Sequence, residues 1–341
     1  MSTSILQHYL ERFRAGGDLP EYAAAFFFDS LLAEQNEALL ADILKAWEAK
    51  GTSEVELFAL AEIMCSRAVK VNSKHEIFVD AVGTGGSKAK TFNVSTAAAF
   101  VIAGAGVPVA KHGNRAATSN SGSADVLSAL GVNPAVEAAK AEECLNTIGI
   151  CFMFAPKFHS LSPILAKVRR ELGVPTIFNN LGPLCNPANA PHQIIGVWRK
   201  DLVEKTARVL ARLGTRKSWI VYGEDGLDEI TLNGETHVAE ITDGKVRLFR
   251  IAPADFGLQA SSLSHLQKST PEASAELIMA ILGGNCDEEA AVNLVLINAA
   301  APIYLAGKAA TLIDGVDMAR NSLSSGAALG KLNDLIEATN R

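Results

Sequence analysis

The chain has 341 residues, of which 48% are hydrophobic and 20% are charged. This length predicts about two domains, and the hydrophobic share excludes an intrinsically disordered chain. The net charge of −6 argues against broad electrostatic binding of nucleic acid or of an anionic membrane.

Neither of the two long apolar stretches predicts a membrane span. Residues 96–110 include two glycines and a proline, and residues 290–307 include two asparagines and a proline. A span needs about 20 predominantly apolar residues, so we expect both stretches to be buried in a protein that binds no membrane. The N-terminus lacks the basic start and apolar core of a secretory signal. The five cysteines are scattered and form no Cys-x-x-Cys pair, so we expect small core residues in a cytoplasmic protein.

The first 70 residues predict helices only. Apolar residues recur there at three- and four-residue spacing, over residues 5–13, 20–32, 36–48 and 54–68. From residue 77 onward, short apolar runs alternate with helical patterns. The runs that predict strands are 77–82, 107–110, 150–155, 193–198 and 218–222. The helices predicted around them are 95–104, 124–130, 136–148, 163–172 and 202–213.

Residues 230–251 alternate apolar and polar side chains, with turns at residues 233–234 and 243–244. This pattern predicts an antiparallel meander, and the chain from residue 271 onward is mostly helical. The whole order favours an α/β fold with a central, mostly parallel sheet covered by helices.

We expect this α/β part to be joined by a small all-helical N-terminal domain. The helical domain comprises residues 1–75 with a joining helical segment at about 162–190, and the α/β domain comprises residues 76–161 and 191–341.

Two segments after the first predicted strand carry glycines and hydroxyls. Gly83-Thr-Gly-Gly-Ser-Lys88 follows the strand directly, and the backbone N–H groups of such a loop can approach a phosphate closely. An ordinary tight turn is the alternative. Asn93-Val-Ser-Thr96 precedes an apolar helix. There, Ser95 or Thr96 could cap the helix, or the free N–H groups could bind an anion.

Lys111-His-Gly-Asn-Arg115 also follows a predicted strand, and hydroxyl residues continue from Thr118 to Ser123. Two cations, an amide and several hydroxyls with little Asp or Glu favour phosphate binding over a solvated turn. Further along, Asp228 and Glu229 are adjacent carboxylates. Such a pair suits Mg²⁺, which binds one or two carboxylates together with phosphates; a solvated acidic turn is the alternative.

Arg169 and Arg170 lie on one predicted helix beside Glu171. Surface ion pairing is the usual role of such residues, but one arginine could bind an acidic substrate through two parallel hydrogen bonds. His159 fits a packing or loop position better than a catalytic base. The chain shows no nucleophile–base signature and no histidine metal pair, so the motifs together indicate group transfer on a phosphorylated, Mg²⁺-bound substrate.

These motifs, in this order and spacing, resemble the anthranilate phosphoribosyltransferase family over about residues 20–335. The family has the nucleoside phosphorylase/phosphoribosyltransferase fold. The matching segments are Gly83-Thr-Gly-Gly86, Asn93-x-Ser-Thr96, Lys111-His-Gly-Asn-Arg115, Ser121-Gly-Ser-Ala-Asp125, Phe178-Asn-x-Leu-Gly-Pro183 with Asn186-Pro187, and Gly226-Leu-Asp-Glu229. The Lys-His-Gly-Asn-Arg block separates this family from nucleoside phosphorylases of the same fold.

The resemblance implies that the amine of anthranilate displaces pyrophosphate from 5-phosphoribosyl-1-diphosphate (PRPP), in tryptophan biosynthesis. The residues it assigns to PRPP are Gly83, Gly86, Ser87, Thr91, Asn93, Val94, Ser95, Thr96, Lys111, His112, Gly113, Asn114, Arg115, Ala116, Ala117, Thr118, Ser119 and Ser123. Those it assigns to anthranilate are Gly83, Asn114, His159 and Arg169, with Arg169 facing the carboxylate. Ser95, Asp228 and Glu229 would hold Mg²⁺, two ions per subunit. It implies no catalytic acid or base, no nucleic-acid partner, and a homodimer formed through the helical domain.

The chain departs from the family pattern at three places. Ser87 stands where the family has an aspartate, which removes a carboxylate near the diphosphate. His159-Ser-Leu-Ser-Pro163 replaces His-Pro-Ala-Met and a basic residue, beside the approach to anthranilate. Cys185 replaces the threonine of Leu-Thr-Asn-Pro, a difference that we assign to packing.

Two other functions remain open. The first two departures leave room for a family member that uses another aromatic amine. A relative without enzymatic activity that binds nucleic acid is the other alternative. The intact Lys111–Arg115 block, the Asp228–Glu229 pair and the acidic net charge favour the enzyme.

Overall fold

The structure is a computed structural model that describes residues 4–87, 89, 91–116 and 121–341. Helices alone precede the first strand: α1 (Ile5–Arg14), α2 (Ala24–Ala33), α3 (Glu37–Lys50) and α4 (Glu54–Arg67). The second predicted helix starts as a short 3₁₀ turn, Glu21–Ala23. Ser4 and Ser53 each close a capping box at the start of their helices, which satisfies free backbone N–H groups there.

An aromatic cluster lies among the N-terminal helices, within a core that also includes one face of the sheet. Phe13 stacks on Trp47 with ring centres 4.8 Å apart, and Phe27 contacts Trp47 edge-on. Each such pair contributes about 0.5–1.5 kcal/mol beyond the area it buries. Tyr22 and Phe26 point outward instead and are 90% and 65% exposed. The apolar face of α2 is therefore divided between this core and the surface.

A seven-stranded sheet forms the centre of the molecule, in the order β3-β2-β1-β4-β5-β6-β7. Its strands are β1 (Val79–Gly83), β2 (Val109–Gly113), β3 (Ile150–Phe154), β4 (His192–Gly196), β5 (Lys217–Gly223), β6 (Thr236–Thr242) and β7 (Lys245–Ile251). The pairs from β3 to β5 are parallel, and β5-β6 and β6-β7 are antiparallel. The fold is the expected mostly parallel α/β sheet with an antiparallel meander at its C-terminal edge.

The meander differs from the prediction in one part. It consists of β5, β6 and β7, and residues 230–235 form no strand. The backbone N–H groups of this segment donate to side chains instead of a neighbouring strand: Ile230 to Asn298 Oδ1 (2.9 Å) and Thr231 to Thr236 Oγ1 (3.1 Å). The alternating sequence pattern does not reveal these competing partners.

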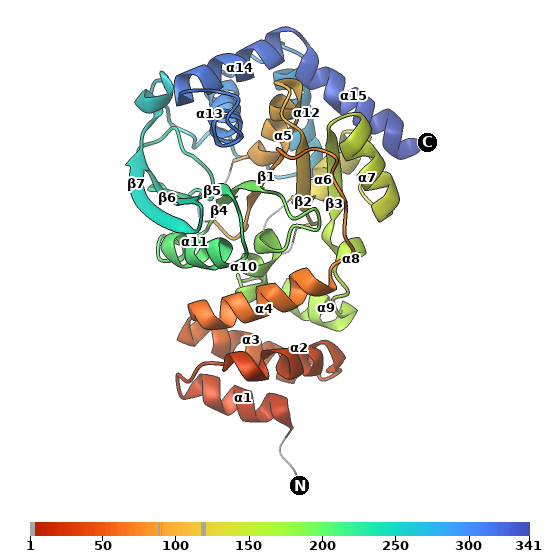
Figure 1. Ribbon diagram of the computed structural model, residues 1–341, viewed down its shortest axis with the longest axis vertical. Helices are drawn as coiled ribbons and strands as arrows, with labels where there is room; N and C mark the ends of the chain where they lie inside the picture. Colours follow the sequence, from red (N-terminus) through yellow and green to blue (C-terminus); the bar gives the residue numbers. More distant parts are fainter. Residues whose placement is uncertain (1–3, 88, 90, 117–120) are drawn as a thin grey trace.

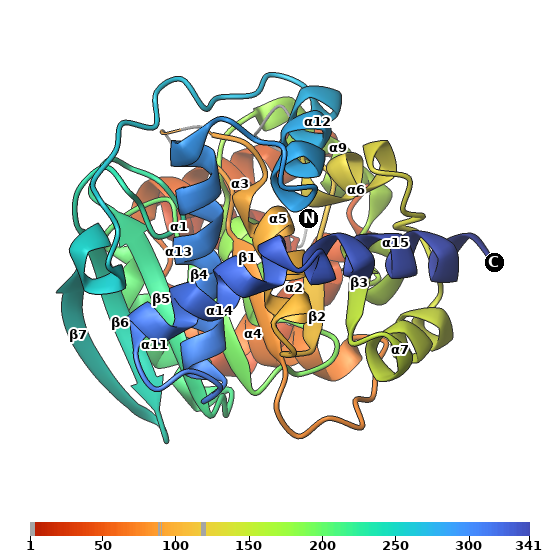
Figure 2. The same ribbon diagram turned by 90° about the horizontal axis from the view of Figure 1, so that it is seen from above.

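Both faces of the sheet are buried, each in a separate core. Ile194 of β4 packs among the residues of one core and its neighbour Ile195 among those of the other, as the alternation of side chains along a strand requires. Helices α5 (Val94–Gly104), α13 (Glu289–Leu305) and α15 (Ala327–Asn340) belong to the first core, and α11 (Leu202–Arg212) to the second. Figure 2 shows α13, α14 and α15 lying across the sheet.

The remaining helices are α6 (Ser123–Ala129), α7 (Ala138–Thr147), α8 (Ala155–Phe158), α9 (Pro163–Leu172), α10 (Ile177–Leu184), α12 (Pro271–Leu282) and α14 (Leu312–Ser324), with a second 3₁₀ turn at Pro253–Phe256. Helices α9 and α10 contact α3 and α4 although they are far apart in sequence. In Figure 1, α1 to α4 lie at one end of the molecule and α14 and α15 at the other. Among the described residues, every helix is too short or too polar to cross a bilayer.

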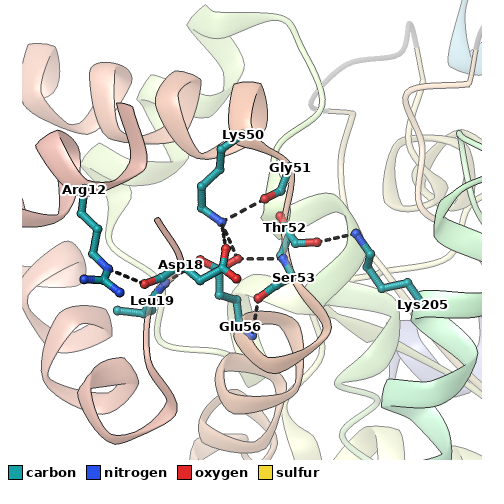
Figure 3. Close-up of polar contacts among 9 residues, drawn as sticks. All are labelled: Arg12, Asp18, Leu19, Lys50, Gly51, Thr52, Ser53, Glu56 and Lys205. Atoms are coloured by element: carbon teal, nitrogen blue, oxygen red, sulfur yellow. Dashed lines mark hydrogen bonds and ion pairs between the residues drawn. The ribbon is translucent and has the colours of Figure 1, made fainter. Parts of the chain in front are cut away.

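A buried ion pair anchors the loop between α3 and α4 (Figure 3). Lys50 Nζ lies 2.8 Å from Glu56 Oε2 and 2.7 Å from Asp18 Oδ1. Glu56 is fully buried, but it also accepts hydrogen bonds from the backbone N–H groups of Leu19 and Ser53. Such full pairing is what makes a buried charge tolerable. Lys205 of α11 donates to the Thr52 carbonyl (2.5 Å), which fastens this loop to the sheet domain.

Candidate functional site

A cavity of about 430 Å³ opens at the carboxyl ends of β1 and β2. Strand β1 lies between β2 and β4, so the chain runs from it first toward one edge of the sheet and later toward the other. In open α/β sheets, ligands bind in the crevice at this switch point. The cavity therefore lies where the fold class places a ligand.

Close backbone approach explains the glycines after β1. A Cβ on Gly83 would lie 2.7 Å from Asp228 Oδ2, and one on Gly86 would lie 2.5 Å from Pro175 Cγ. Gly86 also has a φ of +79°, a conformation that other residues rarely adopt. The Gly85 N–H donates to Asp228 Oδ2 (2.8 Å). The loop is thus tied to a carboxylate from a distant part of the chain, which an ordinary isolated turn would not be.

Buried polar groups hold the end of β2 in place. Lys111 Nζ donates to the Ala81 carbonyl (2.6 Å) and lies 3.3 Å from Ser95 Oγ. Asp80 accepts from the His112 N–H (3.3 Å) and from Asn186 Nδ2 (2.7 Å). Burial raises the pKa of Asp80 to about 6, although the Lys111 ammonium opposes this. Burial also lowers the pKa of Lys111.

Asp228 and Glu229 are half-buried at the cavity, not on a solvated turn. Glu229 Oε1 accepts from the Ser95 N–H (3.2 Å), and its buried Oε2 has no hydrogen-bond partner in the part of the chain that the structure describes. Burial, followed by the charge of Asp228, raises the pKa of Glu229 well above its usual value. An orphaned carboxylate oxygen beside a second carboxylate and a hydroxyl fits a bound divalent cation. Among the described residues, no group of three or more His, Cys, Asp or Glu side chains could hold a metal alone, so phosphate or water ligands would have to complete the site.

Two neutral imidazoles and one guanidinium line another part of the cavity wall. The rings of His112 and His159 have centres 5.1 Å apart, and burial lowers their pKa values to about 3 and about 4. His112 Nδ1 bonds to the Gly182 carbonyl (3.1 Å), and neither buried Nε2 atom has a partner among the residues described. Both rings therefore stay uncharged at neutral pH.

Arg169 of α9 brings a positive charge that has no counter-ion among the described residues. Its guanidinium lies 4.9 Å from the centre of the Phe178 ring, and no described residue bonds to its buried Nε. Burial alone lowers its pKa to about 10, so the group remains protonated at neutral pH. An unpaired buried cation is costly, and a ligand carboxylate would relieve that cost.

The described residues that the sequence singled out divide into two sets. Those that line the cavity are Gly83, Ser87, Thr91, Asn93, Ser95, Lys111, His112, Gly113, Asn114, Arg115, Ala116, Ser123, His159, Arg169, Asp228 and Glu229. Those absent from its lining are Gly86, Val94 and Thr96; the last two are buried inside α5. Ala117, Thr118 and Ser119 lie outside the described residues.

Helix α5 starts differently from the capping alternative. Its N-cap is Asn93, which makes no side-chain capping hydrogen bond, so neither Ser95 nor Thr96 caps the helix. The Ser95 N–H bonds to Glu229 instead, and the N–H groups of Val94 and Thr96 bond to nearby backbone carbonyls.

Sequence reasoning missed other residues of the wall. Gln267 and Lys268 come from the irregular segment before α12 and carry no motif. Phe178, Gly182 and Pro183 belong to a segment that matches a family motif but received no site role. Leu161, from the segment that departs from the family pattern, also lines the cavity.

Known proteins match this chain along almost its whole length. The model of the glycosyl transferase family, a/b domain, matches residues 75–329. An anthranilate phosphoribosyltransferase from Pelotomaculum thermopropionicum is 42% identical over 336 residues, which cover 98% of this chain and 97% of that protein. This chain belongs to the anthranilate phosphoribosyltransferase family.

Solved structures of this family agree with the fold. The anthranilate phosphoribosyltransferase of Thermus thermophilus superposes with a TM-score of 0.87 at 37% identity, covering 98% of this chain and 99% of that one. The enzyme of Saccharomyces cerevisiae, solved in complex with PRPP and Mg, gives a TM-score of 0.88 at 29% identity and covers 99% of both chains.

Proposed function

We propose that this protein transfers the phosphoribosyl group of PRPP to the amine of anthranilate and releases pyrophosphate, as a step of tryptophan biosynthesis. The composition of the cavity wall supports this proposal. The described residues of the wall combine a carboxylate pair suited to Mg²⁺ with a buried guanidinium that has no counter-ion among them. A phosphorylated, metal-bound donor and an acceptor that bears a carboxylate satisfy both groups at once.

The loops after β1 and β2 and the start of α5 would hold the phosphates of PRPP. Backbone N–H groups at a helix N-terminus and in a glycine-rich loop favour anions. The residues that we assign to PRPP are those that the family resemblance named, including Gly86, Val94 and Thr96, which would act through the backbone they shape. We assign Asn114 and Gly83, which line the cavity, to anthranilate as well as to PRPP.

Ser95, Asp228 and Glu229 would hold Mg²⁺ together with the diphosphate, and we propose two ions per subunit. The orphaned Glu229 Oε2 and the position of Asp228 against the glycine loop support this. Bound Mg²⁺ would neutralise the charge that develops on the departing pyrophosphate.

The chain's own residues then act by position and charge. C1 of the ribose becomes cationic as the diphosphate leaves, so the loop N–H groups and Lys111 stabilise the departing charge. Arg169 would hold the acceptor carboxylate and place the amine near C1. The neutral rings of His112 and His159 would border the acceptor without adding charge. An aromatic amine is weakly basic and already carries a free lone pair, so no general base is needed before attack.

Two departures from the family pattern favour a second candidate acceptor. Ser87 and Leu161 both line the cavity, and both differ from the usual family residues. Another aromatic amine with a carboxylate would use the same donor site. Competition between anthranilate and ring-substituted analogues measures this preference directly.

The deciding experiment mixes the purified protein with PRPP, Mg²⁺ and anthranilate and follows the loss of anthranilate fluorescence. We expect the loss to require all three components and to release one pyrophosphate per anthranilate consumed. If another amine releases pyrophosphate from PRPP and anthranilate fluorescence does not fall, the second acceptor is favoured. No turnover with any amine would contradict the proposal.

We also propose the domain division given by the sequence, a cytoplasmic location, and a homodimer formed through the helical domain. The exposed Tyr22 and Phe26 support the dimer, because aromatic side chains on a small helical domain are usually covered by a partner.

A further inference from the structure

Two cysteines from distant parts of the sequence meet where α4 packs against α10. Cys65 lies in the last turn of α4, and Cys185 directly follows α10. The Cys65 thiol donates to the Leu184 carbonyl (3.6 Å), and the Cys185 thiol donates to the Ala61 carbonyl (3.6 Å). Each sulfur thus lies on the backbone of the other helix, next to Leu184 before Cys185 and to Ala61 one turn before Cys65, so the two side chains lie close together.

The two thiols have unequal surroundings. Cys65 is partly exposed, and the Lys70 ammonium lies beside it and donates to its carbonyl (2.5 Å). The neighbouring Cys185 side chain, and after it the charge of Lys70, lowers the pKa of Cys65 against the effect of burial. Cys185 is fully buried, and burial raises its pKa. Reactive cysteines have this combination of partial exposure and a nearby cation.

We propose that Cys65 and Cys185 form a thiol-modification site that reacts with small-molecule disulfides such as oxidised glutathione and closes to an intramolecular disulfide. The Cys65 thiolate attacks one sulfur of the small disulfide, forms a mixed disulfide and releases one thiolate. Cys185 then passes its proton to a departing thiolate and attacks the Cys65 sulfur. Two protein thiols are oxidised, and one small disulfide is reduced to two thiols.

Cys185 departs from the family pattern, which has threonine at this place. A threonine hydroxyl cannot form the cross-link, so the site does not follow from the fold alone. A second cysteine pair in the same chain serves as a comparison. Cys144 and Cys151 are close enough to interact, but both are buried. That pair offers no accessible thiolate to start the exchange.

The cross-link would act on the acceptor side of the cavity. The ring of His159 lies beside the backbone of Cys185, and the next residue, Asn186, donates to Asp80 and to the Ala110 carbonyl. Forming the disulfide rotates Cys185 and moves this backbone. Resting on the proposed function, we expect the KM for anthranilate to rise several-fold, with a smaller change for PRPP.

The test treats the reduced full-length protein with oxidised glutathione, alkylates the remaining thiols, and maps the peptides by mass spectrometry. We expect a Cys65–Cys185 cross-linked peptide that dithiothreitol reverses, while Cys144 and Cys151 are alkylated only after denaturation. Cys185→Thr, which restores the family residue and is expected to fold, should stop at the mixed disulfide on Cys65. Cys65→Ser should leave Cys185 reduced, and Cys286→Ser, at another partly exposed cysteine, should cross-link like the wild type.

Two results would overturn the proposal: Cys65 reacting no faster than Cys286, or glutathione remaining on Cys65 of the wild type while Cys185 stays a free thiol. Because these readouts are chemical, they decide the modification site even if the protein turns over no anthranilate. Circular dichroism of each variant separates loss of the cross-link from loss of the fold.

Discussion

Arg169→Ala removes the guanidinium that lines the cavity without a counter-ion. If this group binds the acceptor carboxylate, the variant should lose acceptor affinity and keep donor affinity. A charge-assisted hydrogen bond to a partly buried carboxylate is worth about 1.5–3 kcal/mol. Since about 1.4 kcal/mol corresponds to tenfold, we expect the KM for anthranilate to rise about ten- to hundredfold.

The structure also predicts that folding is little affected. Among the described residues, Arg169→Ala removes no ion pair and only the contact of the guanidinium with the Phe178 ring. Such a contact is worth about 0.5–1 kcal/mol, or more where it is desolvated. The KM for PRPP should change much less, because other loops hold its phosphates. Steady-state kinetics with each substrate varied in turn, together with thermal unfolding, measures these effects.

Arg170→Ala is the matched control. Arg170 is exposed and lies about 100° further around α9, so neither KM should change. Arg169→Lys should restore binding only in part, because lysine keeps the charge but loses the planar pair of donors. If both KM values in Arg169→Ala stay within about twofold, worth less than 1 kcal/mol, Arg169 does not bind the acceptor, and the segment around Leu161 becomes the next candidate.

Three further results are expected. Asp228→Asn with Glu229→Gln should abolish most activity at low Mg²⁺ and keep the Tm within a few degrees, because the amide oxygens still accept the Gly85 and Ser95 N–H bonds; unchanged turnover across a Mg²⁺ titration refutes the metal assignment. The pKa of His159 is lowered to about 4, so the unfolded chain binds more protons between about pH 4 and 6.5, and stability present above pH 6.5 is lost as the pH falls. Relative to His159→Gln, the wild type should lose about 1 kcal/mol of unfolding free energy between pH 7 and 5.5. If urea unfolding gives the same difference in unfolding free energy between the two proteins at both pH values, His159 is not a buried neutral ring. Phe26→Glu should give a monomer in light scattering, whereas Leu248→Glu, at an exposed residue of β7, should not; a dimer in both variants argues against an interface at the helical domain.

Features that depend on residues close together in the chain could be predicted from the sequence. Helical spacing located α1 to α4 and α9, and the glycine and Lys-His-Gly-Asn-Arg motifs fell at the ends of β1 and β2. These signals are local, because periodicity and turn chemistry act over a few residues. The family resemblance then gave the order of the motifs along the chain.

Tertiary structure alone decided what those segments contact. Asp228 reaches the Gly85 N–H only because β4 and β5 continue the sheet on the far side of β1, so a segment that resembles a solvated acidic turn becomes part of the cavity. Packing of the helices half-buries Arg169 and brings Cys65 close to Cys185. Residues 230–235 lose their predicted strand for the same reason, since side chains such as Asn298 satisfy the backbone there. The burial of a side chain and its hydrogen-bond partners depend on contacts between segments that are distant in sequence. Composition and motif spacing do not show which distant segments pack together.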